Sequence, residues 1–109
     1  MATTTFTSYL NKNVGITAAN IVTAGVGAQT NIIGLCCANT ITTAITVDVY
    51  ITRSAVDYYI VKGATVPAGG SLVAVGGDQK LVLVASDVLK IIASTATCVD
   101  VVTSALVVT

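Results

Sequence analysis

The chain has 109 residues, of which 54% are hydrophobic and only 9% are charged, and its formal net charge is zero. This length fits one domain with a single small core. Five basic and five acidic residues balance each other and form no basic patch, so the composition gives no support for nucleic-acid binding.

The high apolar fraction does not indicate a membrane protein. One of the longest uninterrupted apolar runs, residues 32–38, is far shorter than the roughly 18 residues that a spanning helix needs. The first residues lack the basic and apolar regions of a secretory signal, so we expect neither a membrane span nor a signal peptide.

The low charge points instead to burial against partners. A fold of this size exposes on the order of 5,600 Å² of surface. The five Lys/Arg and five acidic side chains cover such a surface thinly, whereas soluble designs carry roughly a quarter to a third of charged surface. We therefore expect much of the surface to be interface, in a homo-oligomer or with other proteins.

Residues 1–13 are rich in Thr and Asn, with isolated apolar side chains, and are expected to form an extended N-terminal arm. A frayed terminus and an arm that docks on a neighbouring subunit through Phe6 and Tyr9 are both compatible with this pattern. Residues 14–109 are expected to form a single β-sandwich domain.

The rest of the chain is a succession of short apolar segments separated by turn residues. The clearest is residues 46–52, where Val47, Val49 and Ile51 alternate with polar side chains at the period of a half-buried strand. In the last segment both faces are largely apolar, which predicts a central strand or one covered on both sides. The expected strands cover residues 20–24, 30–38, 46–52, 58–61, 72–75, 80–84, 88–93 and 98–108.

These segments predict an all-β fold of about eight short strands, an antiparallel β-sandwich or jelly-roll-like barrel. The turns between them are expected at residues 53–57, which form a hairpin loop, at Gly63, where a strand ends, and at residues 67–70, 76–78 and 85–87. Thr and Val are abundant and β-branched, and Glu is absent, which favours strands over helices.

The three cysteines are Cys36, Cys37 and Cys98. An odd number argues against a closed disulfide framework, and neighbours on a strand point to opposite faces. Only one of Cys36 and Cys37 can therefore face the core beside Cys98. We expect the three cysteines to be small buried hydrophobic residues of a protein made in a reducing cytoplasm. A disulfide from Cys98 to either Cys36 or Cys37 is the alternative.

The residue types do not predict an enzyme. The chain has no His, the commonest general base and metal ligand, and its acidic residues are all Asp. Asp57, Asp78 and Asp87 lie in predicted turns, where Asp is suited to backbone hydrogen bonding. We expect no catalytic residue, no cofactor and no metal site.

The best local candidate for protein contact is the region around the hairpin at 53–57. Aromatic residues and Arg are enriched at interface hot spots. Tyr50, Arg53, Asp57 and Tyr58 are therefore predicted to form a contact patch, with Tyr packing at the core edge as the alternative. A receptor- or glycan-binding module is a weaker hypothesis, because aromatic side chains are few.

Several segments also resemble a known group of proteins. They are Ile45-Thr-Val-Asp-Val-Tyr-Ile-Thr-Arg53, Asp57-Tyr-Tyr-Ile-Val-Lys62, Val66-Pro-Ala-Gly-Gly-Ser-Leu-Val73, Gly76-Gly-Asp-Gln-Lys-Leu-Val-Leu83, Asp87-Val-Leu-Lys-Ile91, Val99-Asp-Val-Val-Thr-Ser104 and, at the start, Thr5-Phe-Thr-Ser-Tyr9 and Asn13-Val-Gly15. Together they resemble small all-β virion structural proteins of tailed bacteriophages, of the cyanophage-like kind. Such proteins usually have Gly where Ser86 precedes Asp87 here.

The resemblance implies a non-catalytic β-sandwich subunit of a virion, made in the host bacterial cytoplasm. One possibility is a capsid decoration or cement protein that forms a trimer or ring and contacts the major capsid protein. The other is a neck, tail or baseplate subunit.

Overall fold

The computed structural model describes residues 4–25, 27–75 and 80–108. Within these ranges the chain forms nine β-strands and no helix. No helix in the described part of the chain is long and apolar enough to cross a membrane. The strands are β1 (Thr4–Val14), β2 (Ala19–Thr23), β3 (Gln29–Asn39), β4 (Ile45–Arg53), β5 (Val56–Val66), β6 (Ser71–Val75), β7 (Leu81–Leu83), β8 (Val88–Ala93) and β9 (Val99–Val108).

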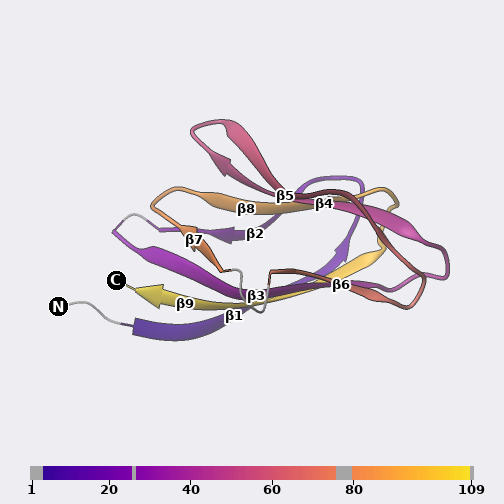
Figure 1. Ribbon diagram of the computed structural model, residues 1–109, viewed down its shortest axis with the longest axis horizontal. Coiled ribbons are helices and arrows are strands. Elements are labelled where there is room, and N and C mark those ends of the chain that lie inside the picture. The colour runs from indigo at the N-terminus through magenta and orange to yellow at the C-terminus, as the bar shows by residue number, and fades with distance from the viewer. Residues whose placement is uncertain (1–3, 26, 76–79, 109) are drawn as a thin grey trace.

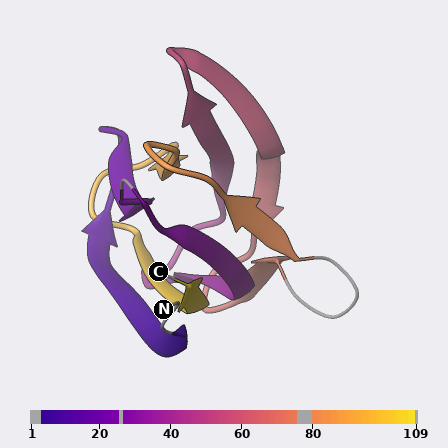
Figure 2. The same ribbon diagram turned by 90° about the vertical axis from the view of Figure 1, so that its left-hand side faces the viewer.

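The strands form two antiparallel sheets that stack as a sandwich, which confirms the predicted fold class (Figure 1). One sheet has the order β1-β9-β3-β6. Strand β7 belongs to the same sheet: it pairs with residues 30–32 of β3, along the same edge on which residues 35–38 pair with β6. The second sheet has the order β2-β8-β4-β5. Figure 2, turned to the end of the sandwich, shows the hairpin of β4 and β5 lying far from β1.

The core lies between the sheets, because strand alternation turns one apolar face of each sheet inward. In β4, Val47 and Val49 are almost completely buried, as the period-two pattern predicted. In β9, Val99, Val101 and Ala105 face the core while Val102 is exposed. The fully buried bulky side chains include Ile32, Leu35, Leu83, Leu89, Ile91 and Val75.

One buried amide ties two connections to the core. The Nδ2 group of Asn39, at the end of β3, donates to the carbonyl oxygens of Thr43, Val66 and Pro67 at 2.9, 3.1 and 3.1 Å. Its Oδ1 accepts from the backbone N–H of Ile41 at 3.0 Å. Asn39 therefore anchors both the β3–β4 loop and the turn that follows β5.

The start of the chain differs from the expected arm. Residues 4–14 form β1, an edge strand paired along its length with β9, from Thr4 opposite Val108 to Val14 opposite Val99. The other strands lie close to their predicted positions, except that β5 covers Val56–Val66 where a strand was expected at residues 58–61. As predicted, β9 is central in its sheet.

Two further predictions concern turns. Gly63 does not end a strand: it lies inside β5 with φ of 67°, at an irregularity in the pairing with β4. Its N–H donates to the Oδ1 atom of Asp48 at 2.6 Å, which holds the irregular backbone. The predicted turn at 76–78, with Asp78, lies outside the described residues.

Candidate functional site

The β4–β5 hairpin carries most of the side chains predicted to make contacts. Its turn is shorter than the predicted loop at 53–57, because Arg53 already pairs with Val56. Only Ser54 and Ala55 form the turn, and both have positive φ, 53° and 63°, as a two-residue type I′ turn requires. The strands therefore remain paired up to the tip.

This register divides the predicted patch between the two faces of the hairpin. Tyr50 is opposite Tyr59 and Thr52 is opposite Asp57, so Tyr50 and Asp57 share one face. Arg53 and Tyr58 point to the other face, where Tyr58 is opposite Ile51. The structure thus brings together Arg53 and Tyr58 on one side and Tyr50 and Asp57 on the other.

Tyr50 is already covered within the chain. Its side chain is 8% exposed, and its ring lies 5.0 Å from that of Tyr59 at an angle of 39°. The Nζ atom of Lys62 lies 4.2 Å from the centre of the Tyr59 ring, a cation–π geometry. Burial raises the pKa of the Tyr50 hydroxyl, and the negative charge of Asp57 adds to the effect. The exposed surface of this face therefore includes Tyr59, Lys62 and Asp57.

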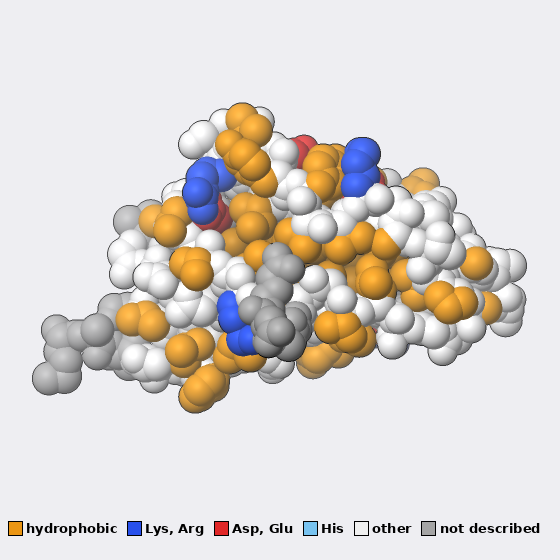
Figure 3. Space-filling view, viewed as in Figure 1, with side chains coloured by type: hydrophobic (Ala, Val, Ile, Leu, Met, Phe, Trp, Pro, Cys, Tyr) orange, Lys and Arg blue, Asp and Glu red, His pale blue; other side chains and the backbone are white. Residues whose placement is uncertain are grey.

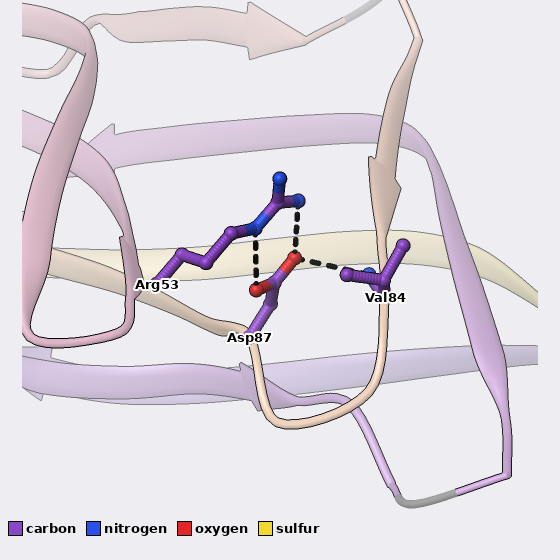
Figure 4. Close-up of polar contacts among 3 residues, drawn as sticks. All are labelled: Arg53, Val84 and Asp87. Carbon is purple, nitrogen blue, oxygen red and sulfur yellow. Dashed lines mark hydrogen bonds and ion pairs between the residues drawn. The ribbon is translucent and has the colours of Figure 1, made fainter.

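On the other face, Arg53 binds a carboxylate. Its Nε and Nη2 groups donate to Oδ1 and Oδ2 of Asp87 at 2.8 and 2.6 Å, a bidentate pair (Figure 4). The Asp87 side chain is 1% exposed and the Arg53 side chain 50%. The Asp87 Oδ2 atom also accepts from the backbone N–H of Val84 at 3.0 Å.

These donors favour the charged form of Asp87. The hydrogen bonds from Arg53 hold the pKa of Asp87 below its usual value, against the opposing effect of burial, and the Val84 N–H contributes in the same direction. The pair joins the end of β4 to the turn before β8. Beside it, Ile51, Arg53 and Tyr58 line an open depression of about 220 Å³, smaller than the roughly 300–1,000 Å³ of usual ligand pockets.

The two side chains predicted to dock from the arm lie on opposite faces of β1. Tyr9 is opposite Thr103 and packs against the core. Phe6 is opposite Leu106 and points away from the other sheet, with 76% of its side chain exposed. In the single chain Phe6 is therefore accessible to a partner, whereas Tyr9 is partly buried.

Phe6 belongs to a larger surface that the sequence analysis did not identify, which we call the outer face of the five-stranded sheet. Two rows of side chains cross this face, one apolar and the other apolar except for Asn31. One row consists of Leu10, Val102, Cys36 and Val73, on β1, β9, β3 and β6. The other consists of Phe6, Leu106, Asn31 and Val82, on β1, β9, β3 and β7. The sequence feature that could have indicated this surface is the last predicted strand, at residues 98–108, because both of its faces are largely apolar.

The cysteines occupy the positions that strand alternation predicted. All three are free thiols. Cys37 and Cys98 are buried, and Cys36 is half-buried on the outer face. Burial raises the pKa of Cys37 to about 12, with a smaller contribution from neighbouring Cys36. The Cys98 thiol donates to the carbonyl oxygen of Thr95 at 2.9 Å.

The described part of the chain contains no group of three His, Cys, Asp or Glu side chains that could hold a metal ion. The side chains around the hairpin are instead satisfied by one another: Thr52 donates to Asp57 at 2.7 Å, and Arg53 donates to Asp87. The site is therefore a surface whose polar side chains are held in place by hydrogen bonds to one another.

No protein-family model matches the sequence, and no curated protein is similar to it at a significant level. Solved structures do match this chain, among them the following two. One is described as Bacillus endospore appendages that form a family of disulfide-linked pili, with a TM-score of 0.53, 16% identity, and coverage of 99% of this chain and 88% of the other. The second, from infectious bursal disease virus strain Gt, has a TM-score of 0.46 and 9% identity, and this chain spans 32% of its length. At such identities, the first similarity establishes a shared β-sandwich fold.

Proposed function

We propose that this chain is a non-enzymatic structural subunit of a larger protein assembly. The observation that carries the proposal is the distribution of exposed apolar side chains. They lie on both sheets and at both edges of the sandwich, which would fit a subunit that contacts neighbours on several sides. They are Phe6, Leu10, Val73, Val82 and Val102 on the five-stranded sheet, Val56, Tyr58 and Tyr59 on β5, and Ile16 and Val84 in connections.

The surface chemistry supports the same proposal. Figure 3 shows Lys, Arg and Asp side chains as isolated spots among larger apolar and uncharged areas. With a net charge of zero, such a surface has little electrostatic repulsion to oppose association. Several strand edges, such as those of β1 and β5, also leave backbone groups available for pairing with another chain.

More specifically, we propose a subunit of a tailed-phage virion, a capsid decoration protein that forms a trimer or ring and contacts the major capsid protein. This step rests on the sequence resemblance, whose segments supply most of β4, β5, β6, β8 and β9. The chain would be made in the host cytoplasm with its thiols reduced. A neck, tail or baseplate subunit is the alternative within the same proposal.

The fold is compatible with assembly, since a chain of similar fold comes from Bacillus endospore appendages described as disulfide-linked pili. In this chain the half-buried thiol is Cys36, and Cys37 and Cys98 are buried. A fibre linked by disulfides through Cys37 or Cys98 would require the sandwich to open. We therefore favour an assembly held by non-covalent contacts.

The test is the copy number of this chain in purified particles of the encoding phage, measured by quantitative mass spectrometry against the major capsid protein. A number comparable to the capsid protein supports the decoration role. A number that fits one or a few rings supports the neck, tail or baseplate. Absence from particles would contradict a virion role and leave only the broader proposal of a structural subunit.

A further inference from the structure

The outer face of the five-stranded sheet has an arrangement that a water-facing sheet seldom has. Antiparallel sheets with one solvated face usually alternate apolar and polar side chains, with the polar ones outward. Here Leu10, Val102 and Val73 point outward with 72%, 52% and 65% of their surface exposed, and Cys36 stands between Val102 and Val73. Because adjacent strands lie about 4.8 Å apart, the four side chains form one continuous apolar ridge.

A second ridge runs parallel to the first, four residues away along β1. It contains Phe6, Leu106 and Val82, together with Asn31. Between the two ridges, β1 and β9 carry small residues, with Ser8 opposite Ser104. On β3, Gly34 is opposite Ser104, and the half-buried Ile33 is the extra residue at the pairing irregularity beside it. Each ridge is about 7 Å from this central row, because outward side chains recur every second residue.

We propose that this outer face packs against the same face of a second copy of the chain. The profile is self-complementary on β1 and β9: the Leu10–Val102 part of a ridge in one copy fits over Ser8 and Ser104 in the other. A shift of one row along the strands brings the two profiles into register. The proposal deepens the proposed function and rests on it, since it names one of the contacts that such a subunit would make.

The charges of the face favour an identical partner. The two ridges and the row between them contain no charged side chain. Beyond the Leu10 ridge, Lys12 and Asp100 neutralise each other at 3.5 Å, and Asp100 also accepts from the N–H of Asn13 at 3.1 Å. Two copies can thus meet without an unpaired charge in the contact. A strongly charged partner would find no complementary charge on the ridges.

The area of the outer face sets the expected strength of the association between two copies. Four strands at about 4.8 Å and seven to nine residues at about 3.4 Å give a face of roughly 460–590 Å² per copy. Two such faces bury roughly 900–1,200 Å² in total, at or below the lower limit of the roughly 1,200–2,000 Å² of stable specific interfaces. We therefore expect association that depends on protein concentration and becomes strong only when many copies are held together.

Cys36 supplies a local probe of this contact. It stands in the Leu10–Val102–Cys36–Val73 ridge, whereas Cys37 and Cys98 are buried inside each chain. Alkylation with iodoacetamide under reducing conditions should modify Cys36 first in dilute protein. As the protein concentration rises, the rate at Cys36 should fall, and sedimentation velocity should show dimers at the same concentrations.

Val102→Lys tests the face directly, because two like charges would meet in the contact. We expect dimerisation weakened by about tenfold or more and loss of Cys36 protection. Val73→Lys, on the short edge strand β6, is a second variant in case a lysine on central β9 impairs folding. Val56→Lys is the matched control, since Val56 is similarly exposed but lies on β5 of the other sheet.

Dimers that disappear in Val102→Lys or Val73→Lys and persist in Val56→Lys would support the proposal. A monomeric wild type with concentration-independent alkylation of Cys36 would overturn it. Dimers that form without protecting Cys36, or that Val56→Lys weakens as much, would also overturn it. In these cases the proposed function would still stand or fall on the copy number in particles, which does not depend on this face.

Discussion

Arg53 and Asp87 form a two-bond ion pair that connects the tip of one hairpin to the turn before β8, although they are 34 residues apart in sequence. The carboxylate is buried and the guanidinium is half exposed, so the arginine covers the acid from the solvent side. Because Asp87 also accepts from the Val84 N–H, it organises its own turn. The pair is a structural brace. Because its guanidinium group is already bound to Asp87, Arg53 is less available to anchor an interface.

The first prediction concerns acid stability. The folded-state pKa of Asp87 is lowered, first by the hydrogen bonds from Arg53. Its stabilising effect is therefore complete above the unfolded-state value of about 3.9 and is lost as the pH falls through the lower folded-state value. Asp87→Asn should lower the unfolding free energy at pH 7 and flatten its decrease below about pH 4.

Urea unfolding monitored by circular dichroism between pH 7 and pH 2 measures this dependence. Arg53→Gln removes the main cause of the pKa shift and should flatten the acid decrease in the same way. An Asp87→Asn variant with the same pH dependence as the wild type would show that the pair does not govern acid stability.

The second prediction concerns the turn residue before Asp87. Ser86 has φ of 71°, in the left-handed region that costs a residue with a Cβ atom roughly 1–2 kcal/mol. Glycine adopts this region freely but loses more entropy on folding. Ser86→Gly should therefore raise the free energy of unfolding by about 0.5–1 kcal/mol, as measured by chemical denaturation. Ser71→Gly, at an exposed position in β6, is the control and should be destabilising.

The third prediction concerns Asn39. Its Nδ2 group faces three carbonyl oxygens, so Asn39→Asp would place a carboxylate oxygen against them with almost no change in shape. We expect a loss of about 3 kcal/mol or more in the free energy of unfolding at pH 7, because the buried groups would lose their donor. Asn20→Asp, at an exposed position of β2, should change stability little. Equal effects of the two substitutions would contradict a special role for Asn39.

The fourth prediction concerns a buried hydroxyl. The Thr103 side chain is 0% exposed, and its Oγ1 atom has no hydrogen-bond partner among the described residues. Replacing it with a methyl group of similar volume removes an unpaired polar group from the core. Thr103→Val should raise the free energy of unfolding by about 1 kcal/mol, measured as a shift of the urea midpoint at constant slope. A loss of stability would mean that the hydroxyl has a partner after all.

The four residues of the predicted contact patch are divided between the two faces of the hairpin, and the reason lies in the length of one turn. Residues 53–57 were expected to form a loop, but the turn contains only Ser54 and Ala55. Turn length sets the register of a hairpin, and register decides which side chains share a face. Tyr50 and Tyr58 were therefore placed together, whereas the structure puts them on opposite faces.

The sequence alone determined most of the strands, because period-two alternation is a local property of residues such as Val47 and Val49. It also determined that one of Cys36 and Cys37 would face the core. It did not reveal β1, whose residues pair with residues of β9 that lie 85 to 104 positions later, nor the ridge of Leu10, Val102, Cys36 and Val73. Only the tertiary structure decided these features, because residues on four strands become neighbours through strand order and register, which are set by long-range pairing.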